Sequence, residues 1–336
     1  MLSLLFACTS TTDTAQELQL EDLASRGALN VGYSAEVLTY TDPLGAEREL
    51  DLIHWFPTDQ DSGARAEYLG IKRDDVYLDA EPLPDTKTVV FSHGHQGFPE
   101  AAGFLMVHLA SWGYHVVAME HAGDTTFDGG DRETEIYYQR PHDVSATLDH
   151  LGVEQTVALG HSFGGYTTFA LTGATYDPEV VDCPEGEERR DFCDTMTEEK
   201  KALFRGGFRD ERVLAAVPMA AGDYDLFGAA GVANVATPTL MMTGDCDHPP
   251  GSFADELWEN LGGEKTSLVL ADGGHNSFTN FAGTLDNCDV LIDAEEGWTV
   301  IQGWTVAFVM LHLDGDTSVQ PVLENAVVWS DAASTR

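Results

Sequence analysis

The feature that most restricts the fold is an alternation that begins near residue 30. Short apolar or β-branched runs, such as "TVVFS" and "TLMMTG", alternate with amphipathic stretches of helical length. No internal repeat or low-complexity block interrupts this order. Strands that alternate with helices are typical of a mainly parallel sheet flanked by helices. The sequence therefore predicts an α/β fold in one domain.

Individual elements can be placed on this pattern. Proline is expected to end an early strand at Pro57, and Pro141 is expected near the start of a helix that ends at Gly152. Apolar runs predict strands at residues 49–57, 87–94, 114–120, 212–219, 239–244 and 267–275. Helical spacing predicts helices at residues 101–113, 140–152, 163–173, 252–262 and 297–315.

Two segments fall outside the alternation. Residues 1–28 are predicted to be a leader and polar tether, which leaves residues 29–336 for the folded domain. Residues 174–210 are rich in acidic side chains and break the rhythm. We predict that they form an excursion or lid, closed by a disulfide between Cys183 and Cys193.

A nucleophile is predicted in the middle of the chain. Gly160, Ser162 and Gly164 fit the pattern G-x-S-x-G, after the apolar run "TVAL" and before a helical stretch. A serine on so tight a turn has strained backbone angles, and small residues two positions on either side let the strand and helix approach. The turn lifts the hydroxyl above the sheet edge, where it can attack a substrate.

A serine hydroxyl needs a base, and the base needs an acid to fix its tautomer. In this architecture the acid and then the histidine follow the serine, each after a later strand. His275 follows a strand and two glycines, and it is the predicted base. Asp247, three residues after the glycine that ends a strand, is the first choice of acid. Asp245 and Asp223 remain alternatives.

Two backbone N–H groups are expected to stabilise the oxyanion. Phe163 follows the nucleophile and supplies one, and His95, in the turn after "VVFSHG", supplies the other from its main chain. A structural turn or a metal pair of His93 and His95 is the alternative for this stretch. Because the serine and the acids already account for a site, no metal is predicted. His248 is read as a neighbour of the acid. Seven further histidines are read as surface or core residues: His54, His108, His115, His121, His142, His150 and His312.

These motifs resemble a known family. The segments "VVFSHGHQGFPEAAGFLMVHLASWGYHVVAMEH" and "GHSFGGYTTFAL" look like the α/β-hydrolase branch that includes platelet-activating factor acetylhydrolases and bacterial predicted dienelactone hydrolases. The resemblance to cutinase-like polyester hydrolases is more distant. The resemblance covers roughly residues 45 to 315 and implies the α/β-hydrolase fold. It implies the same roles for Ser162, His275, Asp247, His95 and Phe163. Dienelactone hydrolases proper use a cysteine nucleophile, so their substrate is not implied.

The predicted function is a serine carboxylic-ester hydrolase that works through an acyl-enzyme and needs no cofactor. Alternative substrates are polyesters, at an open groove flanked by Phe98, Phe163 and Tyr224, and phospholipid acyl chains. His161 is a further candidate for substrate contact. A different class of function is a binding lipoprotein with a vestigial triad.

Five cysteines favour an oxidising compartment, with two disulfides and one modified or free thiol. Five reduced thiols in a cytosolic protein are the alternative. Given the resemblance, a bridge between Cys246 and Cys288 would clamp the acid loop to the histidine loop. Cys8 follows a short apolar run, as in the lipobox of bacterial lipoproteins, and is the predicted lipidation site. We expect an exported protein, secreted or held in the cell envelope, with a lipid anchor as its only membrane contact.

The charge balance restricts the partners. The chain has 57 acidic and 17 basic residues, a formal net charge of −40. Such a field repels phosphate backbones and anionic lipid surfaces, so nucleic-acid binding and polybasic membrane binding are excluded. With only five lysines, the composition also fits adaptation to salty surroundings, in which self-repulsion is screened.

Overall fold

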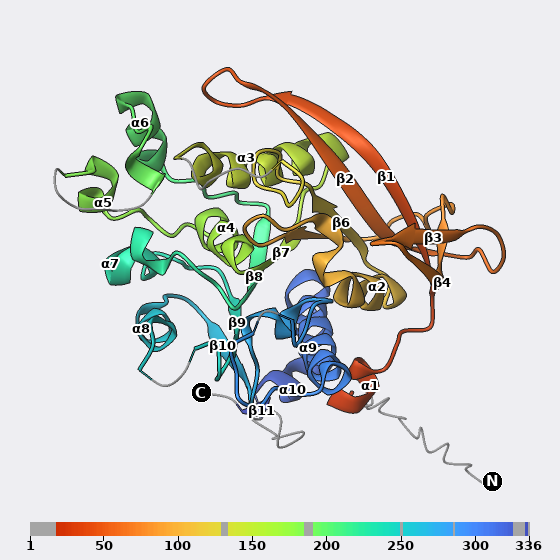
Figure 1. Ribbon diagram of the computed structural model, residues 1–336. Helices are drawn as coiled ribbons and strands as arrows, with labels where there is room; N and C mark the ends of the chain where they lie inside the picture. The colour runs from red at the N-terminus through yellow and green to blue at the C-terminus, as the bar shows by residue number, and fades with distance from the viewer. Residues whose placement is uncertain are drawn as a thin grey trace, which may run out of the picture.

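One sheet of eleven strands organises the computed structural model, which describes residues 18–128, 134–184, 191–248, 251–284, 286–324 and 333–334 (Figure 1). The strand order is β11-β10-β9-β8-β7-β5-β6-β2-β1-β4-β3. The strands are β1 (Asn30–Thr41), β2 (Glu47–Thr58), β3 (Arg65–Tyr68), β4 (Ile71–Leu78), β5 (Thr88–Ser92), β6 (His115–Met119), β7 (Thr156–His161), β8 (Val213–Met219), β9 (Thr239–Gly244), β10 (Lys265–Leu270) and β11 (Ala333–Ser334).

The six central strands, from β6 to β10 in the sheet order, run parallel to one another. Every residue of β5, β7 and β9 is buried, because helices cover both faces. Strands of this kind read as continuous apolar runs. The predicted mainly parallel sheet is confirmed.

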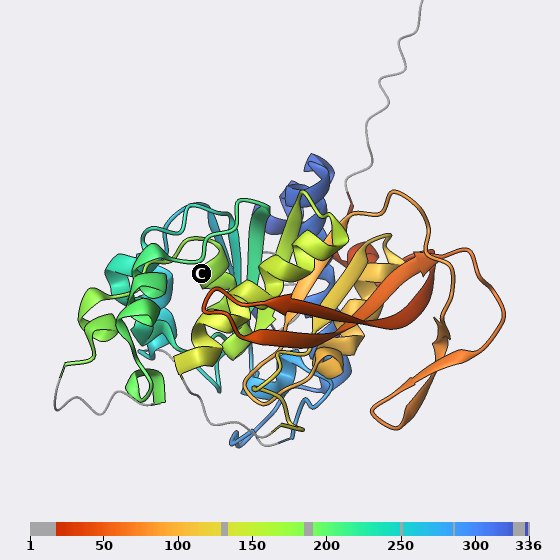
Figure 2. The ribbon, with the colours of Figure 1, turned by 90° about the horizontal axis from the view of Figure 1, so that it is seen from above.

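The other end of the sheet is mainly antiparallel, with β1 and β4 paired in parallel, and was not fully predicted. β1 and β2 form a long hairpin with twelve residue pairs, and β2 runs antiparallel to β6 (Figure 2). The prediction that Pro57 ends β2 is wrong, because the strand includes Pro57 and ends at Thr58. The pairing with β6 reaches only to Trp55, so β2 lacks that neighbour beyond it, and proline is tolerated at such strand ends.

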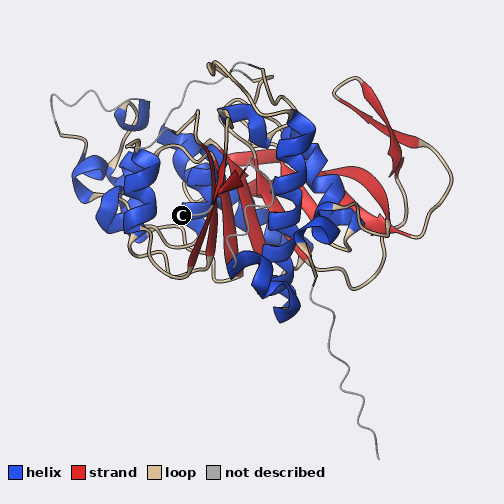
Figure 3. Cartoon of the chain, turned by 90° about the horizontal axis from the view of Figure 1, so that it is seen from below, coloured by secondary structure: helices blue, strands red, loops and turns tan. Residues whose placement is uncertain are grey.

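Helices pack on both faces of the sheet (Figure 3). α2 and α9 share a core with one face, and α3 and α4 pack on the other. The helices are α1 (Leu20–Ala24), α2 (Gly103–Ser111), α3 (Thr134–Leu151), α4 (Phe163–Leu171), α5 (Pro178–Asp182), α6 (Glu198–Gly206), α7 (Gly228–Val232), α8 (Phe253–Asn260), α9 (Ala294–Val309) and α10 (Gln320–Glu324). Short 3₁₀ turns span Pro99–Ala102, Asp191–Cys193, Tyr224–Leu226, His275–Phe278 and Thr317–Val319, and a π turn, Met310–Asp314, follows α9.

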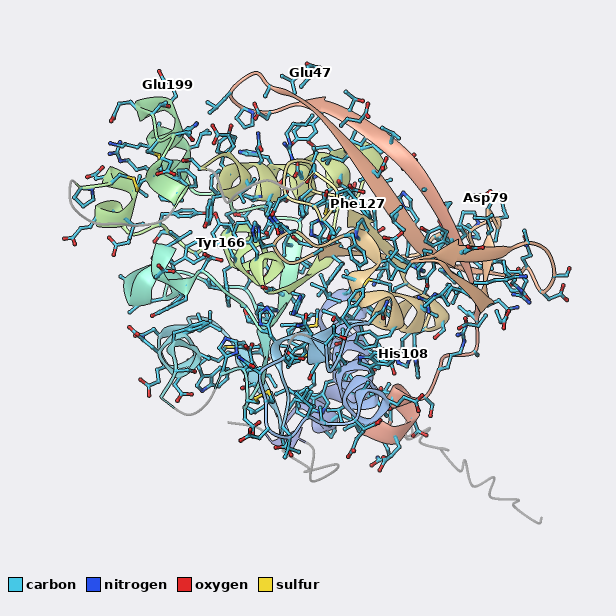
Figure 4. All side chains as sticks on the ribbon, in the orientation of Figure 1. Glu47, Asp79, His108, Phe127, Tyr166 and Glu199 are labelled. Atoms are coloured by element: carbon cyan, nitrogen blue, oxygen red, sulfur yellow. A yellow bond between two sulfur atoms is a disulfide. The ribbon has the colours of Figure 1, made fainter. Side chains whose placement is uncertain are left out.

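Pro141 lies inside α3, not near its start as the sequence predicted. A proline there cannot donate a hydrogen bond to the carbonyl four residues earlier, which is that of Tyr137. The hydroxyl of Tyr166, on α4, donates to that carbonyl at 2.8 Å. A side chain from the neighbouring helix therefore satisfies the acceptor that proline leaves, and α3 continues through it. Tyr166 lies among the side chains of α4 in Figure 4.

The described part of the segment 174–210 carries α5 and α6. Its aromatic side chains pack into a cluster with those of α3, α4 and α7, and Phe192 and Phe204 lie in its buried centre. A disulfide joins Cys183 to Cys193. The described part of the segment is thus packed against α3, α4 and α7, and its action as a lid stays a prediction.

Candidate active site

Ser162 lies on the turn between β7 and α4, with φ 55° and ψ −116°. This left-handed φ is strained for a residue with a side chain, and surrounding packing holds it. A Cβ on Gly160 would lie 2.1 Å from the carbonyl oxygen of Gly164. A Cβ on Gly164 would lie 1.9 Å from the carbonyl oxygen of Ser92. The two glycines are therefore required for strand and helix to come this close.

The structure brings Ser162, His275 and Asp247 together. The Nε2 atom of His275 is 2.9 Å from the Oγ atom of Ser162. The Nδ1 atom of His275 is 2.9 Å from the Oδ2 atom of Asp247. Since a carboxylate can only accept, Nδ1 carries the proton and Nε2 presents a lone pair to the serine hydroxyl. This arrangement can remove the proton of Ser162.

The carboxylate of Asp247 lies between two imidazoles. Nδ1 of His248 is 2.8 Å from the same Oδ2 atom that accepts from His275. Burial alone would raise the pKa of Asp247, but the two histidines outweigh it and hold the pKa below its ordinary range. Asp247 is therefore ionised at neutral pH. His248 was not predicted as part of the site, beyond being a neighbour of the acid.

The two alternative acids lie elsewhere in the same region. Asp245 donates its main-chain N–H to the carbonyl of Leu270, and Asp223 lies buried in the wall of the pocket over Ser162. The carboxylate that contacts Nδ1 of His275 is therefore that of Asp247. The choice of Asp247 as the acid thus agrees with the geometry, and its catalytic role stays a prediction.

His161 is hydrogen-bonded to the main chain of His275. Its Nε2–H donates to the main-chain carbonyl of His275 at 2.8 Å. Burial, and then the nearby His275, lower the pKa of His161 to about 3, so the ring is neutral. The buried side chain links the β7 turn to the histidine loop. Its predicted contact with substrate is not tested by this geometry.

The turn after β5 lies directly beside the nucleophile. A Cβ on Gly94 would be 3.2 Å from Cβ of Ser162. The N–H of Gly97 donates to the carbonyl of Gly94 and closes the turn, and Gln96 within it has φ 50°. The imidazole of His95 is held by Asp124, with 2.5 Å between Nδ1 and Oδ1. His95 therefore directs its side chain away to Asp124, which leaves its main chain for the predicted oxyanion role.

A buried ion pair behind this turn was missed in the sequence. Arg140 and Asp124 have side chains only 1% exposed, and Nε of Arg140 donates to Oδ2 of Asp124 at 2.7 Å. Burial would raise the pKa of Asp124, but Arg140, His95 and the N–H of Gln96 lower it overall. The guanidinium also stacks 4.6 Å from the ring centre of Phe163. The only sequence signal was an arginine inside the aromatic-rich stretch "IYYQRPHD".

A pocket of about 570 Å³ opens over Ser162. Tyr224, a predicted substrate contact, lies in its wall, as do His248 and Phe253. Phe163, another predicted flank of the groove, is fully buried and does not line this wall. Phe98, the third predicted aromatic contact, is not part of this wall either. Its ring packs edge-on against Phe281, with 5.6 Å between ring centres, and it lines a separate hollow together with Phe127.

Other predicted features are placed as follows. A disulfide joins Cys246 to Cys288 and so links the loop of Asp247 to the segment after His275. Cys8 lies outside the described residues. Among the residues that the structure describes, no three histidine, cysteine or acidic side chains are arranged to hold a metal ion. The described helices are too short or too polar to cross a membrane.

Comparison with solved structures agrees with this topology. A ferulic acid esterase from Streptomyces cinnamoneus superimposes with a TM-score of 0.64, over 90% of this chain and 94% of the other, at 21% sequence identity. The chain has the α/β-hydrolase fold. No family model and no curated protein matches its sequence. In the order usual for this fold, Ser162, Asp247 and His275 follow β7, β9 and β10 at the carboxyl edge of the sheet.

Proposed function

We propose that the protein is a serine carboxylic-ester hydrolase. The observation that carries this proposal is the pair of 2.9 Å contacts that His275 makes with Ser162 and Asp247 on a strained strand-to-helix turn. A surface histidine has no need of a partly buried acceptor and a strained serine partner at once. The arrangement has the geometry that nucleophilic catalysis by serine requires.

The reaction follows from the proton positions. Nε2 of His275 takes the hydroxyl proton as Oγ of Ser162 attacks the ester carbonyl, and the negative oxygen that forms is bound by the N–H groups of His95 and Phe163. The imidazolium, stabilised by Asp247, then protonates the departing alcohol and leaves an acyl-serine. A water molecule attacks this ester with His275 as base, which releases the carboxylic acid and restores the serine.

The pocket favours a small ester with an apolar part. Its volume of about 570 Å³ lies in the range of sites for small molecules, and Tyr224 and Phe253 offer aromatic surface beside Ser162. The structural neighbour is described as a ferulic acid esterase, an enzyme for an aromatic acid. Esters of aromatic or short aliphatic acids are therefore the first substrates to try.

A polymeric ester is the second candidate, and exposed rings favour it. Phe253 is 42% exposed at the pocket wall, and Phe127 is 80% exposed in the hollow that also contains Phe98. Exposed aromatic side chains of this kind suit contact with an extended apolar chain. Hydrolysis of a polyester film would distinguish this substrate from a soluble ester.

Export is part of the proposal. Two disulfides are compatible with an extracellular protein, and lipidation of Cys8 would provide an anchor. Acyl labelling or mass spectrometry of the protein from its native host would test the anchor.

The deciding experiment is the substitution Ser162→Ala. We expect hydrolysis of p-nitrophenyl acetate to fall by roughly 10⁴- to 10⁶-fold, and labelling by a fluorophosphonate to disappear. Ser111→Ala is the matched control, because Ser111 is fully buried at the end of α2, away from the pocket. Undiminished turnover in Ser162→Ala would overturn the proposal.

A further inference from the structure

We infer that the buried pair of Arg140 and Asp124 is a positioning device for the oxyanion donor of His95. This inference rests on the proposed function and deepens it. It assigns to two side chains that do not line the pocket over Ser162 a measurable part in the chemical step. Three contacts carry it: Arg140 to the Gly94 carbonyl, Asp124 to His95, and Asp124 to Gln96.

The peptide that joins Gly94 to His95 is held in a fixed orientation. The carbonyl of Gly94 and the N–H of His95 belong to the same planar trans peptide, so fixing the direction of one fixes the other. Three donors converge on that carbonyl: Nη2 of Arg140 at 3.0 Å, Nδ1 of His93 at 2.7 Å and the N–H of Gly97 at 3.0 Å. They hold the carbonyl on one side and therefore the N–H on the other.

Asp124 also holds His95 and Gln96 in place. Oδ1 of Asp124 lies 2.5 Å from Nδ1 of His95 and accepts the N–H of Gln96 at 3.1 Å. Gln96 has a left-handed φ, which a side chain disfavours, so the turn needs such an anchor to keep its shape. One carboxylate therefore fixes both the side chain of His95 and the backbone after it.

Burial makes the contacts of this pair rigid. Asp124 and Arg140 are almost fully buried, and Nη1 of Arg140 also donates to the carbonyl of His93 at 2.6 Å and to Oγ of Ser92 at 3.1 Å. In a low-dielectric interior such charge-assisted bonds are strong and have few alternatives. The guanidinium thus ties the end of β5 to α3, and the turn cannot move without breaking the pair.

The device continues into the hairpin of β1 and β2. Oγ of Ser92 is 2.9 Å from Nε2 of His121, whose Nδ1 is 2.8 Å from Oδ2 of Asp143. Asp143 in turn accepts from Nε of Arg48, on β2, at 2.7 Å. The buried polar contacts therefore run without a break from the hairpin to the turn beside Ser162.

The test compares Asp124→Asn with the unchanged enzyme. We expect kcat for p-nitrophenyl acetate to fall by about 10- to 100-fold while KM changes little, because a misplaced donor weakens the transition state and spares the ground state. Phenylboronic acid forms a tetrahedral adduct on Ser162, so its affinity should fall by a similar factor.

Two further variants keep the test decisive. Asp210→Asn removes another paired carboxylate, whose side chain is 9% exposed and which binds Arg212 at the opposite end of the strands, and it should lower the melting temperature without changing kcat. If Asp124→Asn does not fold, His95→Ala removes the 2.5 Å contact with Asp124, together with an edge-on ring contact to Phe163, and should also lower kcat and boronate affinity together.

The outcomes separate the two proposals. Normal kcat and boronate affinity in folded Asp124→Asn, or in His95→Ala when Asp124→Asn does not fold, would overturn the positioning role while Ser162-dependent hydrolysis stands. Equal losses of kcat in Asp124→Asn and Asp210→Asn would reduce the effect to general destabilisation. Hydrolysis that survives Ser162→Ala would overturn the proposed function itself.

Discussion

The two sides of Ser162 are held in place by different means. On the oxyanion side, the turn after β5 is anchored by Arg140 and Asp124, whose side chains are 1% exposed. On the acid and base side, Asp247 is 19% and His275 37% exposed, and their region carries the disulfide between Cys246 and Cys288. One side is fixed by buried charge and the other by a covalent link between more open segments.

The difference follows from where the residues lie. The oxyanion turn is packed between α3 and α4, where a paired charge can be fully enclosed. The loops after β9 and β10 lie nearer the end of the sheet, where solvent weakens ionic contacts and a covalent link keeps its full strength. The His161 hydrogen bond to the carbonyl of His275 is the main polar tie from the nucleophile turn to that side. Three experiments test this difference between the two sides of Ser162.

The largest effect is expected from Asp247→Asn. The amide cannot enforce the tautomer of His275 that leaves Nε2 free to accept, so kcat should fall by about 10⁴-fold with little loss of stability. Steady-state hydrolysis of p-nitrophenyl acetate measures it. Asp245→Asn is the matched control, since Asp245 is adjacent in the chain and its main chain binds Leu270. If Asp245→Asn instead causes the larger loss, the acid is misassigned.

A smaller effect is expected from removing each disulfide by paired Cys→Ser substitutions. The bridge Cys246–Cys288 spans 42 residues and Cys183–Cys193 spans 10, so loop-closure entropy predicts losses of roughly 4 and 3 kcal/mol in the free energy of unfolding. Urea denaturation measures both. Only the first should also lower kcat, because it alone joins the loop of Asp247 to the segment after His275. Equal kcat values in both variants would show that the bridge does not position the site.

The sequence predicted the catalytic half of the fold well. The strands β5, β7 and β9 are buried on both faces and read as mainly apolar runs, and the glycines around Ser162 mark the turn. β1, β3 and β4 were missed because their exposed faces mix charged residues into a weak alternation, as in "IKRDDVYL". Pro141 was wrongly predicted near a helix start. The helix continues through it because Tyr166, on another helix, donates to the carbonyl that proline leaves without a donor.

The sequence predicted the nucleophile, the acid and the base, because each lies in a local motif. Ser162, Asp247 and His275 each follow a strand and a glycine, a relation visible along the chain. Arg140 and Asp124 have no such mark, since a charged residue in a sequence reads as exposed. Their pairing brings a helix residue onto a loop that lies 16 positions earlier, and only the fold shows that both are buried.

The smallest effect concerns salt, which should act on the surface and not on the anchor of the oxyanion turn. Exposed carboxylates repel one another across a chain of net charge −40, and each such repulsion costs about 0.2–1 kcal/mol at low salt. The unfolding free energy should therefore rise by at least 1 kcal/mol, on the order of the sum of a few pairs, between low and molar sodium chloride. Buried pairs are screened much less, so the drop in kcat between the unchanged enzyme and Asp124→Asn should be the same at both salt concentrations. Urea denaturation and kinetics on the same samples measure the two quantities. A kcat ratio that collapses in high salt would place Asp124 in contact with solvent, and the contrast between the two sides of Ser162 would then be lost.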